Sequence, residues 1–164
     1  MIILGIDPGY AIIGYGVIDD SKNDSEMVLD YGAITTPKED SLPVRLEAIE
    51  ASLKFLFDKF KPDVVAIEEL FYFKNQKTII QVAQARGVII LACQKYCGKI
   101  YEYTPLQIKQ ALTGQGRAEK AQVQYMVKAI LGLNSIPKPD DAADALAVAI
   151  CHSQTSPSLN QNKV

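Results

Sequence analysis

Short apolar runs separated by polar turns fill the first part of the chain and predict strands. The first run, Ile2–Asp7, is followed by a proline–glycine pair that favours a turn. Two further runs, Ala11–Asp19 and Met27–Thr35, flank the polar residues 20–25, which are typical of a hairpin loop. The sequence therefore predicts three consecutive strands that form an antiparallel meander.

Beyond residue 40 the hydrophobic period changes and predicts helices that alternate with two more strands. One apolar stripe follows Ser41, a favoured N-cap residue, with spacings of three and four that indicate a helix of about five turns. Its members are Leu42, Leu46, Ile49, Leu53, Leu56 and Phe60. The runs Val64–Ile67 and Lys99–Tyr103 predict strands. Further helices are expected at Asn75–Tyr96, Pro105–Leu112 and Ala118–Leu131, and in a last segment capped by Asp140 or Asp141.

This order of elements predicts an α/β fold in which a mixed five-stranded sheet is sandwiched between helices. We expect one domain over residues 1–152 and a frayed, disordered tail over residues 153–164. No apolar run reaches the eighteen or so residues that span a bilayer, and no basic leader precedes a long apolar block. We therefore expect a cytoplasmic protein without a membrane partner.

Four acidic residues stand where a carboxylate is difficult to explain by structure alone. Asp7 and Glu68 end apolar strands, and Asp141 and Asp144 are three residues apart on one face of the last helix. Each has a simpler explanation alone: Asp7 as a turn former, the helix pair as charges that favour a helix N-terminus. Together they would repel one another unless cations bound, and hard oxygen ligands suit Mg²⁺ or Mn²⁺.

The charges are distributed unevenly along the chain, although the net charge is only −2. Residues 1–73 carry 6 basic and 14 acidic side chains, whereas residues 74–128 carry 9 basic and 2 acidic ones. Residues 129–164 carry 2 basic and 3 acidic side chains. The basic middle segment is a candidate phosphate-binding surface, although long helices also carry solvated lysines.

Three cysteines leave two interpretations open. Cys93 and Cys97 are four residues apart on a predicted helix and could form a zinc site with His152. The alternative is that they and Cys151 are reduced thiols in or near the core of a cytoplasmic protein.

An ordered set of short motifs resembles the bacterial RuvC family of Holliday junction resolvases from residue 1 to about residue 152. The motifs are Gly5-Ile6-Asp7-Pro8-Gly9, Ile67-Glu68 with Phe71, Lys74-Asn75, Gln84-Ala85-Arg86-Gly87-Val88, Gly116-Arg117-Ala118-Glu119-Lys120 and Asp141-Ala142-Ala143-Asp144-Ala145-Leu146. The resemblance implies an RNase H-like fold and a homodimer. It also implies Mg²⁺-dependent cutting of two opposed strands at a four-way DNA junction.

The resemblance assigns roles to individual residues. Asp7, Glu68, Asp141 and Asp144 match the metal-binding quartet of the family, whereas Asp140 and Glu69 fall outside it. The residues implicated in DNA contacts are Phe71, Lys74, Lys77, Arg86, Lys109, Arg117 and Lys120. Phe71 matches a base-stacking aromatic, although core packing is an alternative. Phe73 stands where relatives usually carry a small residue, so Phe71, Tyr72 and Phe73 all compete for that role.

The resemblance further implies two Mg²⁺ ions per active site, for which Mn²⁺ substitutes, and products with 5′-phosphate and 3′-hydroxyl ends. It also implies coupling to the RuvA–RuvB branch-migration complex. The helix Asn75–Tyr96, with Gly87 and the run Val88–Leu91, is the candidate subunit contact, unless those residues only face their own sheet. The sequence predicts no cleavage preference.

Three other functions are compatible with parts of the sequence. They are a related nuclease that acts on flaps or RNA–DNA hybrids, an actin-like phosphotransferase suggested by the opening motif, and a junction-binding scaffold without catalysis. Phosphotransferases of that class need a duplicated domain to enclose ATP. A pure binder gains nothing from four acids near phosphate.

Overall fold

The computed structural model describes residues 1–70, 79–155 and 163–164. Its centre is a five-stranded mixed sheet with the strand order β3-β2-β1-β4-β5. Strands β1, β2 and β3 pair antiparallel, and β4 and β5 join parallel to β1. The strands are β1 (Ile2–Asp7), β2 (Ile12–Asp19), β3 (Val28–Thr35), β4 (Val64–Glu68) and β5 (Ile100–Tyr103).

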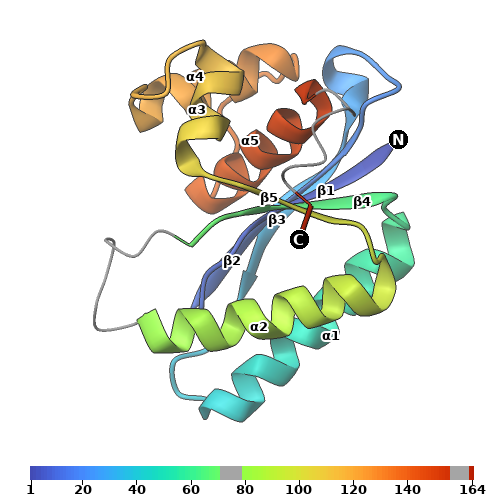
Figure 1. The fold of residues 1–164 in the computed structure, drawn as a ribbon, viewed down its shortest axis with the longest axis vertical. Helices are drawn as coiled ribbons and strands as arrows, with labels where there is room; N and C mark the ends of the chain where they lie inside the picture. Colours follow the sequence, from blue (N-terminus) through green and yellow to red (C-terminus); the bar gives the residue numbers. More distant parts are fainter. Residues whose placement is uncertain (71–78, 156–162) are drawn as a thin grey trace.

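Helices cover both faces of the sheet (Figure 1). On one face lie α1 (Leu42–Phe60) and α2 (Ile79–Tyr96), and on the other α3 (Pro105–Thr113), α4 (Lys120–Ile130) and α5 (Asp140–Gln154). The predicted mixed five-stranded sheet between helices is therefore confirmed. Among the helices of the described ranges, none combines the length and apolarity that crossing a bilayer demands.

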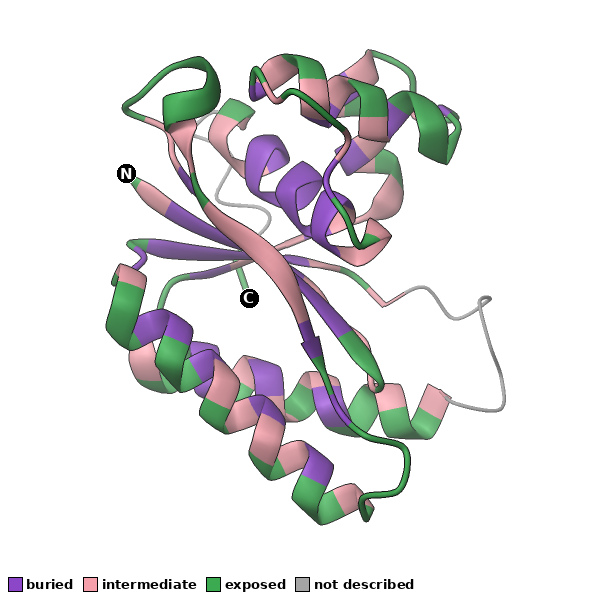
Figure 2. Ribbon diagram, turned by 180° about the vertical axis from the view of Figure 1, so that it is seen from behind, coloured by how far each residue is buried: buried purple, intermediate pink, exposed green. Residues whose placement is uncertain are grey.

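The two faces of the sheet bury different kinds of side chain. Helices α1 and α2 each bury one apolar stripe, whereas α5 is buried on all sides from Ala145 to Cys151 (Figure 2). A helix that is apolar all round belongs in the interior of a protein. Helix α5 therefore forms the centre of the second layer, between the sheet and the pair α3 and α4.

Element boundaries differ from the predictions at a few residues. A 3₁₀ turn, Asp24–Met27, precedes β3, and α4 begins at Lys120 rather than Ala118 because Glu119 is its N-cap. The predicted cap of α5 is wrong, because Pro139 takes that position and both Asp140 and Asp141 lie in the first turn. The expected start of α2 at Asn75 lies outside the described residues.

The structure excludes the zinc-site alternative for the cysteines. Cys93 packs in the core between the sheet and helices α1 and α2, whereas His152 lies on the opposite face, where its Nδ1 is 2.7 Å from the Tyr103 hydroxyl. The three cysteines are free thiols, and burial raises the pKa of Cys93 and Cys151 to about 12. Reduced core thiols explain these residues.

The end of the chain returns to the edge of the sheet. Lys163 forms an isolated antiparallel bridge with Tyr101, and the Val164 amide donates to the Ile100 carbonyl at 3.0 Å. The expected disorder does not hold for Ser153 and Gln154, which belong to α5, and it remains a prediction for residues 156–162, which lie outside the described part.

Candidate active site

Asp7 and Glu68 leave the sheet side by side. Strands β1 and β4 are parallel neighbours with Ile6 opposite Ile67, so the residue that follows each of these emerges at the same edge. Ile6 and Ile67 are buried toward α1 and α2. Because side chains alternate along a strand, Asp7 and Glu68 both point toward the α5 face.

Two glycines allow the backbone of α5 to lie directly on this face. A Cβ atom at Gly14 would stand 1.9 Å from the Asp141 carbonyl oxygen, and one at Gly5 would stand 2.1 Å from that of Ala145. No larger residue fits at either position without moving the helix. The close approach brings the first turns of α5, with Asp141 and Asp144, to the strand ends that carry Asp7 and Glu68.

The four carboxylates interact electrostatically. Burial, followed by the charges of Glu68, Asp144 and Asp141, raises the pKa of Asp7 to about 8. A hydrogen bond between the carboxyl groups of Asp7 and Glu68 adds to this rise in the pKa. A carboxyl group that holds a proton at neutral pH lies where negative charge is poorly compensated. This arrangement favours a positive ligand beside Asp7.

A cavity of about 540 Å³ opens beside these acids. Three of the four carboxylates line it; Asp141 does not, although its charge contributes to the raised pKa of Asp7. Apolar residues of α3 to α5 form the rest of the wall, with two lysines among them. The lining residues are Asp7, Glu68, Pro105, Leu106, Ile108, Lys109, Gly116, Lys120, Val123, Asp144 and Ala147.

Capping boxes position the two lysines of this cavity. At the start of α3 the Thr104 amide donates to Gln107 Oε1 at 2.8 Å, and the Gln107 amide donates to Thr104 Oγ1 at 3.2 Å. At the start of α4 the Glu119 amide donates to Gln122 Oε1 at 2.8 Å. These bonds satisfy amide groups that a helix start leaves free, and so fix where each helix begins. Lys120 is the first residue of α4, and Lys109 lies in the second turn of α3.

Lys120 neutralises part of the acidic cluster. Its Nζ lies 2.9 Å from Asp144 Oδ2 and 3.8 Å from Asp140 Oδ2. Lys109 lines the same cavity from α3. The cavity therefore holds carboxylates on one wall and ammonium groups on another, which suits a phosphodiester bound between cations.

The donor chemistry of the quartet fits a hard divalent cation, since Asp7, Glu68 and Asp144 offer carboxylate oxygens to one cavity. Within the described residues, no three histidine, cysteine or acidic side chains already form a metal site. Asp7, whose pKa is raised to about 8, holds its proton beside Glu68 at neutral pH, and Asp144 is paired with Lys120. Loading an ion would require that proton and that ammonium to leave.

Of the other predicted DNA-contacting residues, the two that the structure describes, Arg86 and Arg117, do not line the cavity. Arg86 is partly buried and forms an ion pair with Glu102 of β5, which competes with a phosphate contact. Arg117 is exposed in the loop before α4. Phe71, Lys74 and Lys77 lie outside the described residues, as do Tyr72 and Phe73. Their DNA contacts remain predictions.

The sequence analysis did not identify Arg45, which supports the loop that follows Asp7. Arg45 is buried on α1, its guanidinium lies 3.6 Å from the centre of the Tyr10 ring, and its Nε donates to Thr36 Oγ1 at 2.8 Å. Tyr10 belongs to the loop that follows Asp7, so Arg45 holds that loop in place. The available signal was a charged residue four positions before Ile49, on the core-facing stripe of a helix.

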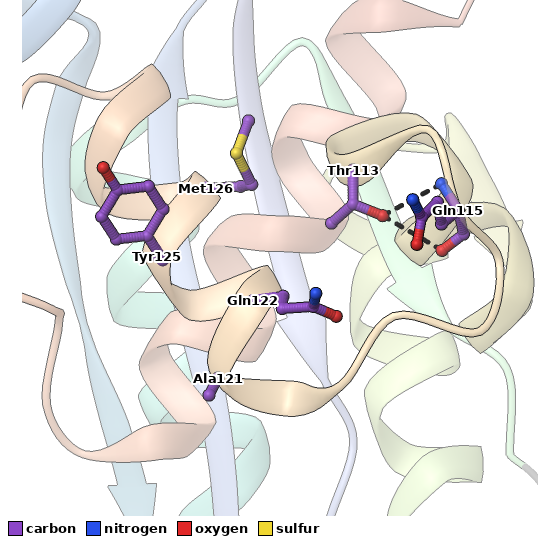
Figure 3. Close-up of a pocket in the computed structure, with 6 residues that line it drawn as sticks. All are labelled: Thr113, Gln115, Ala121, Gln122, Tyr125 and Met126. Atoms are coloured by element: carbon purple, nitrogen blue, oxygen red, sulfur yellow. Dashed lines mark hydrogen bonds between the residues drawn. The ribbon is translucent and has the colours of Figure 1, made fainter.

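A second cavity, of about 440 Å³, lies between the end of α3 and α4 (Figure 3). The Thr113 hydroxyl accepts from the Gln115 amide and donates to the Gln115 carbonyl there, and the exposed Tyr125 lies at the other end. The six residues that line it carry no charge, so it offers no site for acid–base or metal chemistry: Thr113, Gln115, Ala121, Gln122, Tyr125 and Met126.

Comparison with known proteins gives consistent results. Residues 3–152 match the family model described as crossover junction endodeoxyribonuclease RuvC. The chain is 56% identical over 160 residues to the protein of that name from Caldicellulosiruptor saccharolyticus, covering 97% of this chain and 96% of that one.

Solved structures agree. The Thermus thermophilus RuvC structure superposes with a TM-score of 0.89 at 32% identity and covers all of both chains. The structure of T. thermophilus RuvC in complex with Holliday junction substrate superposes with a TM-score of 0.85 at 32% identity. The match covers 99% of this chain and 98% of that one.

These matches confirm the RNase H-like fold that the resemblance implied. Nucleases of this family depend on metal ions. The motifs, the acid-bearing edge of the sheet and the matches over nearly the whole chain agree, and the chain belongs to the RuvC family of crossover junction endodeoxyribonucleases.

Proposed function

We propose that this chain resolves four-way DNA junctions by paired symmetric nicks during recombination and repair. The observation that carries the proposal is the single cavity in which Asp7, Glu68 and Asp144 face Lys109 and Lys120. Metal-assisted hydrolysis of a phosphodiester needs acidic side chains that bind the cations and basic side chains that bind the phosphates. The related structure bound to a Holliday junction supports the choice of substrate.

We assign two Mg²⁺ ions to each site, held by Asp7, Glu68, Asp141 and Asp144, with Mn²⁺ as a substitute. Asp7 interacts electrostatically with all three other acids of the quartet, so it is the residue that we expect to contact both ions. When bound, such ions activate water and stabilise the departing oxygen of an in-line displacement at phosphorus. The products would carry 5′-phosphate and 3′-hydroxyl ends.

The lysines have a separate role. Lys109 and Lys120 enter the cavity from α3 and α4, where they would neutralise and orient the phosphates that flank the cut. Each phosphate neutralised in this way makes binding more sensitive to salt, by about 0.9 log unit per log unit of salt.

A homodimer would bring two such sites to one two-fold symmetric junction. Helix α2 supplies a candidate contact in Ile80, Gly87 and Leu91, which repeat at helical spacing on its outer face. Ile80 and Leu91 are 72% and 66% exposed, and a Cβ atom at Gly87 would meet nothing within 4 Å in this chain. Ile89 is excluded from that contact because it is buried against its own sheet.

Two further expectations rest on the family alone. They are the cytoplasmic location and the coupling to the RuvA–RuvB branch-migration complex. Related nucleases that cut flaps or RNA–DNA hybrids share the metal chemistry, so the substrate must be tested directly.

The test compares cleavage of a four-way junction, a flap and an RNA–DNA hybrid, with all strands labelled, with and without Mg²⁺. We expect paired nicks in opposed strands of the junction only, and only with Mg²⁺. Asp7→Asn should abolish cutting, while junction binding stays equal or tightens because a negative charge is removed. Asp58→Asn, on the far side of the sheet, is the control. Preferred cleavage of the flap or hybrid, or normal cutting by Asp7→Asn, would contradict the proposal.

A further inference from the structure

Three ion pairs form a chain at the start of α5 and end at the candidate active site. Lys138 Nζ lies 2.6 Å from Asp140 Oδ1, Lys120 Nζ lies 3.8 Å from Asp140 Oδ2, and the same Nζ lies 2.9 Å from Asp144 Oδ2. Asp140 and Asp144 are four residues apart, so they stand on one side of α5. Lys120 reaches both carboxylates from α4.

Lys120 and a metal ion would compete for Asp144. A carboxylate oxygen that accepts a charge-assisted hydrogen bond from an ammonium group is not free to bind a cation on the same side. Under the proposed function Asp144 binds such a cation, so Lys120 has to leave it. Lys120 must nevertheless stay at the cavity if it is to contact a phosphate.

Asp140 offers Lys120 a second position. Because the Nζ already lies 3.8 Å from Asp140, a shift of about 1 Å reaches hydrogen-bond distance. Asp140 does not line the cavity and lies outside the quartet, so it remains available when the quartet is occupied. Lys120 and Asp140 are exposed, at 55% and 48%, and Asp144 is partly exposed at 27%; ion pairs that solvent reaches are weak enough to exchange.

We infer that Asp140 is a positioning residue: it receives Lys120 when Asp144 turns to the metal, and so keeps the ammonium group at the mouth of the cavity. Lys138 shares Asp140 and limits how tightly Asp140 holds Lys120. This inference rests on the proposed function, because it presumes that Asp144 binds a cation.

A simpler role for Asp140 predicts the opposite result. If it only repelled DNA, Asp140→Asn would tighten junction binding and would cut as fast as the wild type or faster. If it positions Lys120, the same variant loses rate at saturating junction, by about tenfold or more, because displacing a catalytic group by about 1 Å can cost up to a hundredfold. Junction affinity should not fall.

The experiment measures single-turnover cleavage at saturating junction and, independently of activity, Mn²⁺ binding to the intact protein by electron paramagnetic resonance. Asp140→Asn should slow cleavage about tenfold and weaken Mn²⁺ binding about threefold, because Lys120 must be released into water. Asp140→Glu should restore both. In a Lys120→Gln background, Asp140→Asn should change neither quantity further.

The matched control is Asp58→Asn, which breaks the exposed Lys54–Asp58 pair of α1 at 2.5 Å and should change nothing. Additive effects of the Lys120 and Asp140 substitutions would overturn the inference, as would unchanged Mn²⁺ binding with equal or faster cutting by Asp140→Asn. A wild-type protein that binds no Mn²⁺ or leaves junctions uncut would refute the proposed function as well. If the wild type binds Mn²⁺ and cuts junctions but Asp140→Asn changes neither quantity, only this inference is refuted.

Discussion

The two faces of the sheet are packed in different ways. One face carries the candidate active site, and the other carries the candidate subunit contact. On the α5 face, Gly5 and Gly14 let helix backbone touch strand backbone, so the acidic side chains are held by main-chain contact. On the α1 and α2 face, large side chains such as Ile49 and Ile89 fill the space. Backbone contact leaves little freedom, whereas side-chain packing adapts. The rigid face carries the candidate active site, and the adaptable face presents exposed apolar residues.

Glycine substitutions on the two sides should give the largest contrast. Gly5→Ala drives a Cβ atom to 2.1 Å from a carbonyl oxygen, so we expect a loss of about 3 kcal/mol or more in the free energy of unfolding. Gly87→Ala meets nothing within 4 Å and should stabilise α2 by about 1 kcal/mol. Urea unfolding of both variants provides the measurement. Equal effects would mean that α5 does not lie directly on the sheet.

The pH dependence of stability should come chiefly from the α5 face. Burial and neighbouring acids raise the pKa of Asp7 from 3.8 to about 8, so the folded protein holds a proton that the unfolded chain releases. Without metal, that contribution is therefore present below about pH 4 and is lost as the pH rises toward 8.

Asp7→Asn should remove this loss and stabilise the metal-free protein at pH 8 by roughly 1–3 kcal/mol, since one pKa unit corresponds to about 1.4 kcal/mol before solvent screening. Unfolding curves at pH 5 and pH 8 test it, with Asp58→Asn as the control. If the wild type and Asp7→Asn change in parallel between these two values, Asp7 does not hold the proton.

The smallest effect on folding should come from the exposed apolar residues of the other face. Leu91→Glu should change the free energy of unfolding by no more than about 0.5 kcal/mol, because its side chain is 66% exposed. It should nevertheless convert a dimer into a monomer in sedimentation experiments. Phe55→Glu on α1, at a site 62% exposed, should leave the dimer intact. A dimer that survives Leu91→Glu would move the contact away from α2.

Much of this architecture could be predicted from the sequence because its signals are local. The apolar run Ile2–Asp7, the helical stripe of α1 and the proline at the start of α3 indicated these elements and their order. The predicted N-cap of α5 was wrong because aspartate is a common capping residue and two aspartates follow Pro139 in the sequence. In the structure Pro139 is the N-cap residue, and no side chain caps the helix.

Other features required the tertiary structure. The ion pair of Arg86 with Glu102 joins residues sixteen apart in sequence, and no local pattern indicates it. The roles of Lys120 and Asp140 depend on how α4 meets α5. No local pattern around Gly14 indicates that its missing side chain makes room for the backbone of α5. Contacts between distant segments are what the sequence analysis could not supply.

The central claim is that the acids of β1, β4 and α5 converge to hold divalent cations. Anomalous diffraction from crystals soaked in Mn²⁺ tests it most directly. We expect two peaks per chain, both in contact with Asp7, one beside Glu68 and one beside Asp144, and neither in crystals of Asp7→Asn. Peaks elsewhere on the molecule, an empty wild-type cavity, or the same two peaks in the variant would contradict the account.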